Sequence, residues 1–239
     1  MRTRHQSRLS RGVPGDAVAS GTFRDQRLPA LIGALFQPPP AGIVALLRGS
    51  RMVLSLATFA AGLYALKGQR VLVVDAGNST DPYIVSRLAL AARRDPQPVL
   101  SRIHIIRTFT VHQLAGLTFR RLEPFIRERA PGLVILSGAT SLFADANVPL
   151  KEANLLLREI AAEVQRQAER GCKVLVTAAD APVESGRKHL HLPWLHVASR
   201  SIRVDPSTDS GQGLVFRHEK PGSHLVETMP ADSLAPFLR

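Results

Sequence analysis

Residues 43–66 read IVALLRGSRMVLSLATFAAGLYAL, and this stretch decides the fold. Its first five residues form a short apolar run, which is typical of a buried strand. Residues 52–66 form a longer apolar run that has the length of a buried helix. A strand that passes through a glycine into a helix is typical of parallel sheets that helices cover.

The same alternation continues along the chain. Further strands are expected at 70–75, 103–106, 133–136 and 174–176, and further helices at 82–94, 111–129 and 150–170. Connections of this length can cross over a sheet, so the pattern predicts an α/β fold with a mostly parallel central sheet flanked by helices. Strand-like segments follow Trp194, and we expect these C-terminal strands to be antiparallel. They lie at 195–204, 213–218 and 224–228.

Length and charge bound the organisation of the chain. Its 239 residues suit one α/β domain, and we assign the core domain to residues 23–239. Residues 1–22 are assigned to a flexible basic arm, which contains Arg2, Arg4, Arg8 and Arg11. The formal net charge of +12 and the isoelectric point near 11.2 favour contact with a polyanion, because Lys and Arg that meet phosphates release counterions. A solvated basic surface is the alternative.

Several kinds of site are missing from the sequence. The single cysteine, Cys172, excludes an intramolecular disulfide, and no cluster of Cys and His has the spacing of a zinc site. The longest apolar stretch, residues 52–66, is too short to span a membrane. We therefore expect a cytoplasmic protein without metal or cofactor, which associates with the nucleoid if it binds DNA.

The turn after the first strand is where a phosphate-binding loop would lie. Such a loop needs G-x-x-x-x-G-K-[ST], because its backbone N–H groups, lysine and hydroxyl hold the phosphates and magnesium. The four defining positions are occupied here by Leu46, Arg51, Met52 and Val53. We expect Met52 and Val53 to be buried in the core. Gly49 and Ser50 remain near a helix start, where residual anion binding is one interpretation and a solvated helix end is the favoured one.

From about residue 28 to 227, the order and spacing of these segments resemble the ATPase core of RecA-superfamily recombinases, most closely the archaeal and eukaryotic RadA branch. LVVDAGNSTDP at 72–82 resembles the family's D-T-E-G-T-F-R-P, and TFTVHQ at 108–113 resembles A-F-N-T-D-H-Q. Residues 133–143 resemble L-L-I-V-D-S-A-T-A-L-Y, and VLVTAA at 174–179 resembles V-V-I-T-N-Q. HVASRSIR at 196–203 resembles H-A-S-T-T-R-L. The resemblance implies a RecA-like P-loop fold.

The departures from the family pattern all fall on its ATP site. Gly77 stands where the family keeps its water-activating glutamate, Ser137 replaces the Walker B aspartate, and Ala179 replaces the nucleotide-sensing glutamine. The resemblance therefore implies a degenerate nucleotide site and a pseudo-ATPase rather than an enzyme. Its residues are Leu46, Gly49, Ser50, Arg51, Met52, Val53, Gly77, Ser137 and Ala179.

The family holds DNA with two loops. The first corresponds to residues 144–149, which carry no positive charge, and the second to residues 180–193, which contain Arg187, Lys188 and His189. With the basic arm, these three residues are the DNA-binding candidates. The sequence thus predicts a non-catalytic recombinase paralogue that binds DNA without sequence preference or assists a recombinase in DNA recombination and repair. One alternative is a RecA-fold regulator that binds proteins and has no DNA affinity, like cell-division inhibitors or mutagenesis-accessory proteins. Another is an enzyme, such as a divergent ATPase.

Overall fold

A computed structural model describes residues 42–181, 186–207, 213–219 and 226–230. The basic arm, with its four arginine candidates, and the expected start of the core domain at residue 23 lie outside the described residues.

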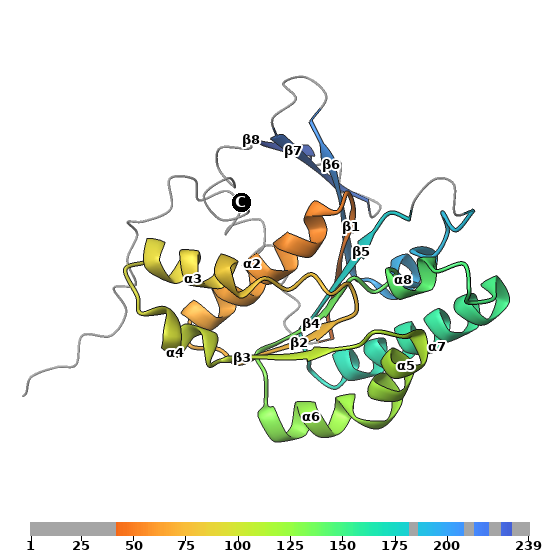
Figure 1. The fold of residues 1–239 in the computed structure, drawn as a ribbon, viewed down its shortest axis with the longest axis horizontal. Helices are drawn as coiled ribbons and strands as arrows, with labels where there is room; N and C mark the ends of the chain where they lie inside the picture. Colours follow the sequence, from red (N-terminus) through yellow and green to blue (C-terminus); the bar gives the residue numbers. More distant parts are fainter. Residues whose placement is uncertain (1–41, 182–185, 208–212, 220–225, 231–239) are drawn as a thin grey trace, which may run out of the picture.

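Among the described residues, eight strands form one sheet in the order β3-β2-β4-β5-β1-β6-β7-β8 (Figure 1). The strands are β1 (Val44–Gly49), β2 (Val71–Asp75), β3 (Ile103–Arg107), β4 (Leu133–Ser137), β5 (Val174–Ala179), β6 (Arg200–Pro206), β7 (Gly213–His218) and β8 (Val226–Pro230). The strands from β3 to β6 are parallel, whereas β7 and β8 are antiparallel. The expected mostly parallel sheet is confirmed, and so are the antiparallel strands for β7 and β8, whereas β6, also expected to be antiparallel, runs parallel to β1.

Helices cover both faces of the sheet, as Figure 1 shows. One face carries α2 (Met52–Leu66), α3 (Pro82–Ala91) and α4 (Pro96–Leu100). The other face carries α5 (Val111–Arg120), α6 (Leu122–Arg129), α7 (Leu150–Glu169) and α8 (Leu192–Val197), with a short 3-10 turn η1 (Leu142–Ala144) before α7. No helix within the described ranges combines the length and the apolar character needed to cross a membrane.

Strand β1 sits between the two hydrophobic cores. Val44 and Leu46 point into the core under α5 to α8, whereas Ala45 and Leu47 point into the core under α2. A strand buried on both faces is an unbroken apolar run, which is why the sequence pattern identified it. Helix α2 is apolar on nearly all sides, because the sheet covers one side and α3 covers another.

Two boundaries differ from the sequence prediction. The helix expected at 111–129 is two helices, because Arg121 leaves helical geometry at φ −124° and the chain restarts at Leu122. The restart places Pro124 in a first turn, where a missing N–H does no harm. The strand expected from residue 195 begins only at Arg200, because residues 192–197 form α8 with a proline in its first turn.

The end of β1 fits closely against β6. Gly49 has φ +120°, and a Cβ built on it would lie 2.4 Å from the carbonyl oxygen of Val204. Both the backbone conformation and the space therefore require glycine at this position.

We expect Gly49→Ala to lower the free energy of unfolding by about 2 kcal/mol or more, since it adds backbone strain and a clash with a main-chain oxygen. Urea denaturation measures this change. Gly116→Ala is the matched control, because Gly116 lies within α5 with nothing within 4 Å of the added Cβ. That substitution should raise stability by about 0.5–1 kcal/mol. Equal effects of the two substitutions would contradict the close fit of Gly49.

Candidate functional site

The connection from β1 to α2 consists of only two residues, Ser50 and Arg51. The Ser50 N–H donates to the Val204 carbonyl at 2.8 Å, so β6 occupies it. The N–H groups of Val53 and Leu54 donate back to the carbonyls of Ser50 and Arg51, both at 3.1 Å. A phosphate-binding loop needs a wide turn lined with free N–H groups. This connection is too short to form one.

The positions predicted for a degenerate loop are distributed over the strand and the helix. Leu46 is fully buried inside β1, three residues before the strand ends. Val53 is fully buried in the core under α2, which confirms its predicted burial. Met52 was also predicted to be buried, but its side chain is only half-buried where it packs against that core. Arg51 is exposed, and its side chain contacts no acidic group among the described residues.

The other three positions lie at the same edge of the sheet. Ala179 is the register partner of Gly49 at the ends of β5 and β1. Gly77 lies beside Ser137, because its N–H donates to the Ser137 carbonyl at 3.1 Å. A Cβ built on Gly138 would lie 2.6 Å from the Gly77 Cα, so the two backbones almost touch. Backbone therefore fills the space between the ends of β2 and β4.

Asp75 is the buried carboxylate at this edge, and it holds the turn that follows β2. It accepts hydrogen bonds from the N–H groups of Ser79 and Thr80 at 3.0 Å, and the Arg107 Nε lies 3.5 Å away. The Ser79 and Ser137 hydroxyls are 3.3 Å apart. With its oxygens committed to backbone donors, Asp75 serves the turn rather than a reacting group.

Arg187 does not extend from its loop toward solvent, which corrects its prediction as a phosphate contact. It is buried, and its guanidinium donates to the carbonyls of Phe143 at 2.8 Å, Val148 at 2.5 Å and Ala146 at 3.5 Å. One arginine therefore ties the loop after β5 to the loop after β4. Lys188 and His189, the other two candidates in this loop, are exposed.

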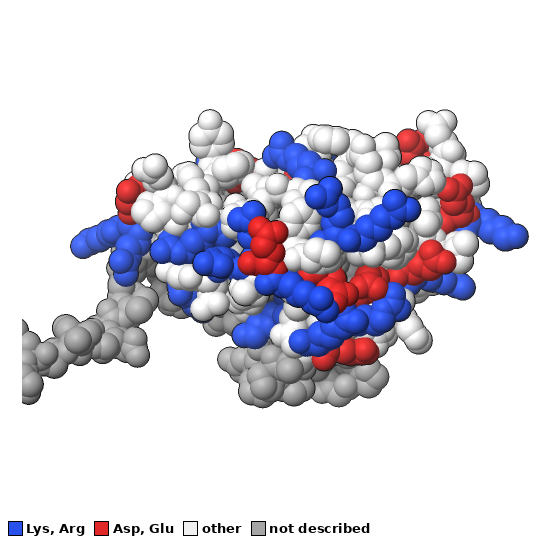
Figure 2. All heavy atoms as spheres, turned by 90° about the horizontal axis from the view of Figure 1, so that it is seen from below, with Lys and Arg blue, Asp and Glu red and all other residues white. Residues whose placement is uncertain are grey.

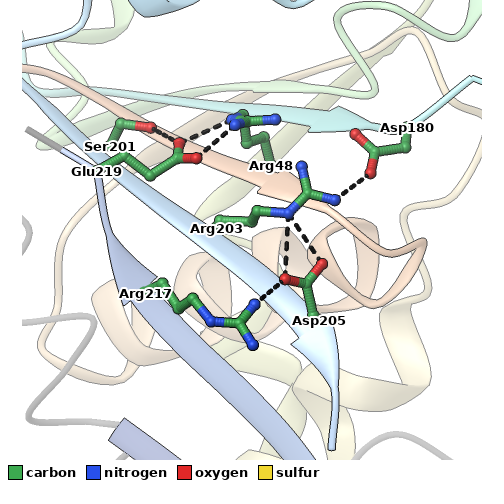
Figure 3. Close-up of polar contacts among 7 residues, drawn as sticks. All are labelled: Arg48, Asp180, Ser201, Arg203, Asp205, Arg217 and Glu219. Atoms are coloured by element: carbon green, nitrogen blue, oxygen red, sulfur yellow. Dashed lines mark hydrogen bonds and ion pairs between the residues drawn. The ribbon is translucent and has the colours of Figure 1, made fainter. Parts of the chain in front are cut away.

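Three arginines form a row across β1, β6 and β7 at the opposite end of the sheet from β3 (Figure 3). Arg203 is the register partner of both Arg48 and Arg217. Each arginine meets at least one carboxylate. Arg48 pairs with Glu219, Arg203 pairs with Asp205 and Asp180, and Arg217 pairs with Asp205.

Three carboxylates therefore balance the charges of this row. Burial alone would lower the pKa of Arg203, but the hydrogen bond that it donates to Asp205 and the charges of Asp180 and Asp205 outweigh burial and raise that pKa. Burial, together with the charge of Arg48, lowers the pKa of the neighbouring His191, so its imidazole is neutral at neutral pH. A polyanion would have to displace existing ion pairs to bind here.

A groove of about 810 Å³ runs between α7 and α8. Its polar lining comes from Arg158, His189 and His196 together with the amides of Asn154 and Gln165. Ala161, Ala162, Leu192, Pro193 and Val197 complete the wall. The sequence prediction included only His189. Arg158 reads as an ordinary helix-surface residue and His196 was expected in a strand, so only the fold brings them together. The adjacent Ala161 and Ala162 leave space on an otherwise leucine-rich helix, and they were the one feature of the sequence that could have indicated a groove on α7.

Several other basic side chains are exposed without a hydrogen bond or ion pair to any described residue. They include Arg51, Arg93, Arg94, Arg120, Arg158 and Lys188. Figure 2 shows one face on which Lys and Arg are spread broadly, with Asp and Glu among them. These free cations, rather than the arginine row, can meet phosphates.

No protein-family model matches this chain, and no curated protein matches it. The described residues also hold no group of three or more His, Cys, Asp or Glu side chains that could bind a metal ion.

We expect Arg187→Ala to lower the free energy of unfolding by about 1–3 kcal/mol, because it leaves buried carbonyls without their donor. Lys188→Ala is the matched control, and it should change stability by no more than about 0.5 kcal/mol because the side chain is exposed. Urea denaturation of both variants measures the difference. If Arg187→Ala unfolds at the same urea concentration as the parent protein, the loops do not depend on this side chain.

We expect ATP with magnesium to leave the melting temperature unchanged, because the β1–α2 connection offers no loop for phosphates. A ligand at a hundred times its dissociation constant would stabilise the fold by about 2.7 kcal/mol, which thermal denaturation detects readily. A functional P-loop ATPase in the same assay is the positive control. A higher melting temperature with ATP, or phosphate release above background, would count against a closed nucleotide site.

Proposed function

We propose that this chain is a non-catalytic RecA/RadA-like protein that binds DNA without sequence preference, alone or beside a recombinase. The observation that carries this proposal is the two-residue β1–α2 connection, which replaces a phosphate-binding loop. The sheet order and the helices on both faces are compatible with a RecA-like fold. The chain thus combines that architecture with a closed nucleotide position, which supports a pseudo-ATPase.

The charges of the chain support DNA as the ligand. Its net charge is +12, and the free cations are spread over the surface rather than gathered in one pocket. Arginine and lysine on a convex surface neutralise phosphates without reading bases. Aromatic residues make up only 5% of the chain, so few side chains can stack on bases. Binding that depends on salt and not on sequence is therefore expected.

A protein-binding regulator without DNA affinity is the second candidate. The specific observation in its favour is the apolar floor of the groove between α7 and α8, because alanine, leucine and valine side chains do not bind phosphate. A DNA-binding experiment separates the two functions.

We expect the chain to bind short fluorescent single- and double-stranded DNA with an affinity that falls steeply as salt rises. Deleting residues 1–12 removes four arginines and should lower the salt slope by up to about 0.9 for each duplex phosphate that these arginines neutralise. Lys188→Ala should weaken binding about equally on unrelated sequences and lower the slope by about 1. Fluorescence anisotropy over a salt series measures each slope.

Arg166→Ala is the matched control, because Glu163 lies 2.5 Å from the Arg166 guanidinium and already neutralises it. This variant should keep the parent slope. Salt-independent binding, or unchanged slopes in both the deletion and Lys188→Ala, would favour the protein-binding regulator.

A further inference from the structure

We infer that the groove between α7 and α8 is a docking site for an acidic amphipathic helix of a partner protein. This site adjoins Lys188, one of the proposed DNA contacts, and its apolar floor distinguishes it from them.

The shape of the groove suits a helix. Residues 154, 158, 161, 162 and 165 lie on one face of α7, because their spacing repeats the helical turn. The small side chains of Ala161 and Ala162 leave a depression in the middle of this face. Helix α8 and the nearby His189 form the opposite wall. Two helices with small residues between them form the kind of groove into which a third amphipathic helix fits.

The floor of the groove and part of its α8 wall are apolar. Leu192 is 50% exposed on the α8 side, and Pro193 and Val197 line the same wall. Leu155, beside Asn154 on α7, is 58% exposed. One exposed leucine is ordinary, but leucines on both helices beside a concave surface mark a region that a partner would cover.

The charge of the groove fixes the character of the partner. Among the described residues, the ionisable side chains that line it are Arg158, His189 and His196, with no Asp or Glu. The Arg158 side chain has no ion pair with any described residue, and Lys188 is exposed next to His189. Carboxylates on a docking helix would therefore be the first acidic partners of these cations.

A nucleic acid fits this groove less well than a protein helix. No aromatic side chain of the described part of the chain lines it, so these residues offer bases no surface for stacking. A phosphate backbone would leave the alanines, Leu192 and Val197 uncovered, whereas a leucine of a docking helix would cover them. The mixture of apolar floor and basic rim thus matches leucines flanked by acidic residues.

The test uses a fluorescent synthetic 16-residue helix with leucines on one face and glutamates beside them. Two control peptides keep its length, one with lysine in place of glutamate and the other with serine in place of leucine. Fluorescence anisotropy with the full chain should show saturable binding of the first peptide and at least about tenfold weaker binding of both controls. Excess duplex DNA should leave the first peptide bound.

Substitutions in the groove locate the binding site. Arg158→Glu should weaken peptide binding at least about tenfold, and Ala162→Gln should weaken it similarly because it fills the groove without changing charge. Arg120→Glu makes the same charge change on α5, outside the groove, and should leave the affinity unchanged. Melting temperatures equal to the parent value establish that the variants fold.

Three results would overturn the inference. One is equal binding of the acidic and lysine peptides, and another is equal weakening by Arg158→Glu and Arg120→Glu, which would reveal unspecific charge attraction. The third is displacement of the peptide by duplex DNA, which would make the groove a DNA contact. That last result would leave the proposed DNA-binding function intact, so the two proposals fail separately.

Discussion

The contact between the end of β1 and β6 governs what this fold can do. Gly49 turns at φ +120° against the Val204 carbonyl, and the next N–H, that of Ser50, donates to the same oxygen. The chain then enters α2 after one more residue. In an open α/β sheet, ligands usually bind beyond the carboxyl ends of the strands, where backbone N–H groups are free. Here β6 takes up that position at the end of β1, because the Val204 carbonyl accepts the Ser50 N–H.

The same principle extends to the charged side chains around this edge. Asp75 and Arg187 are buried, Arg48 and Arg203 are half-buried, and backbone groups or opposite charges satisfy all four. Burying an ionised group is costly unless it is paired, so their pairing is a condition of the fold. The charges left to meet a ligand are therefore the exposed ones without a partner among the described residues, such as Arg51, Lys188 and Arg158.

The sequence predicted the sheet well because buried parallel strands are continuous apolar runs. The apolar run at 43–47 predicted β1, and the run at 52–66 predicted α2. The structure places α2 at the expected residues. Local patterns were weaker where a short element depends on its surroundings, as in α8, whose last three residues were expected to begin a strand. The prediction for Arg187 failed because charge in a loop normally indicates exposure, and only the fold reveals three carbonyls within its reach.

The candidate groove lies at the limit of what a single sequence can reveal. Arg158 and His196 are 38 residues apart in the chain, and each has an ordinary helical environment of its own. They line one groove only because α7 and α8 cover the same face of the sheet side by side. A phosphate site can be predicted from a loop motif, since one segment supplies most of its groups. A protein-docking groove is assembled from separate helices, so packing must be known before its chemistry can be recognised.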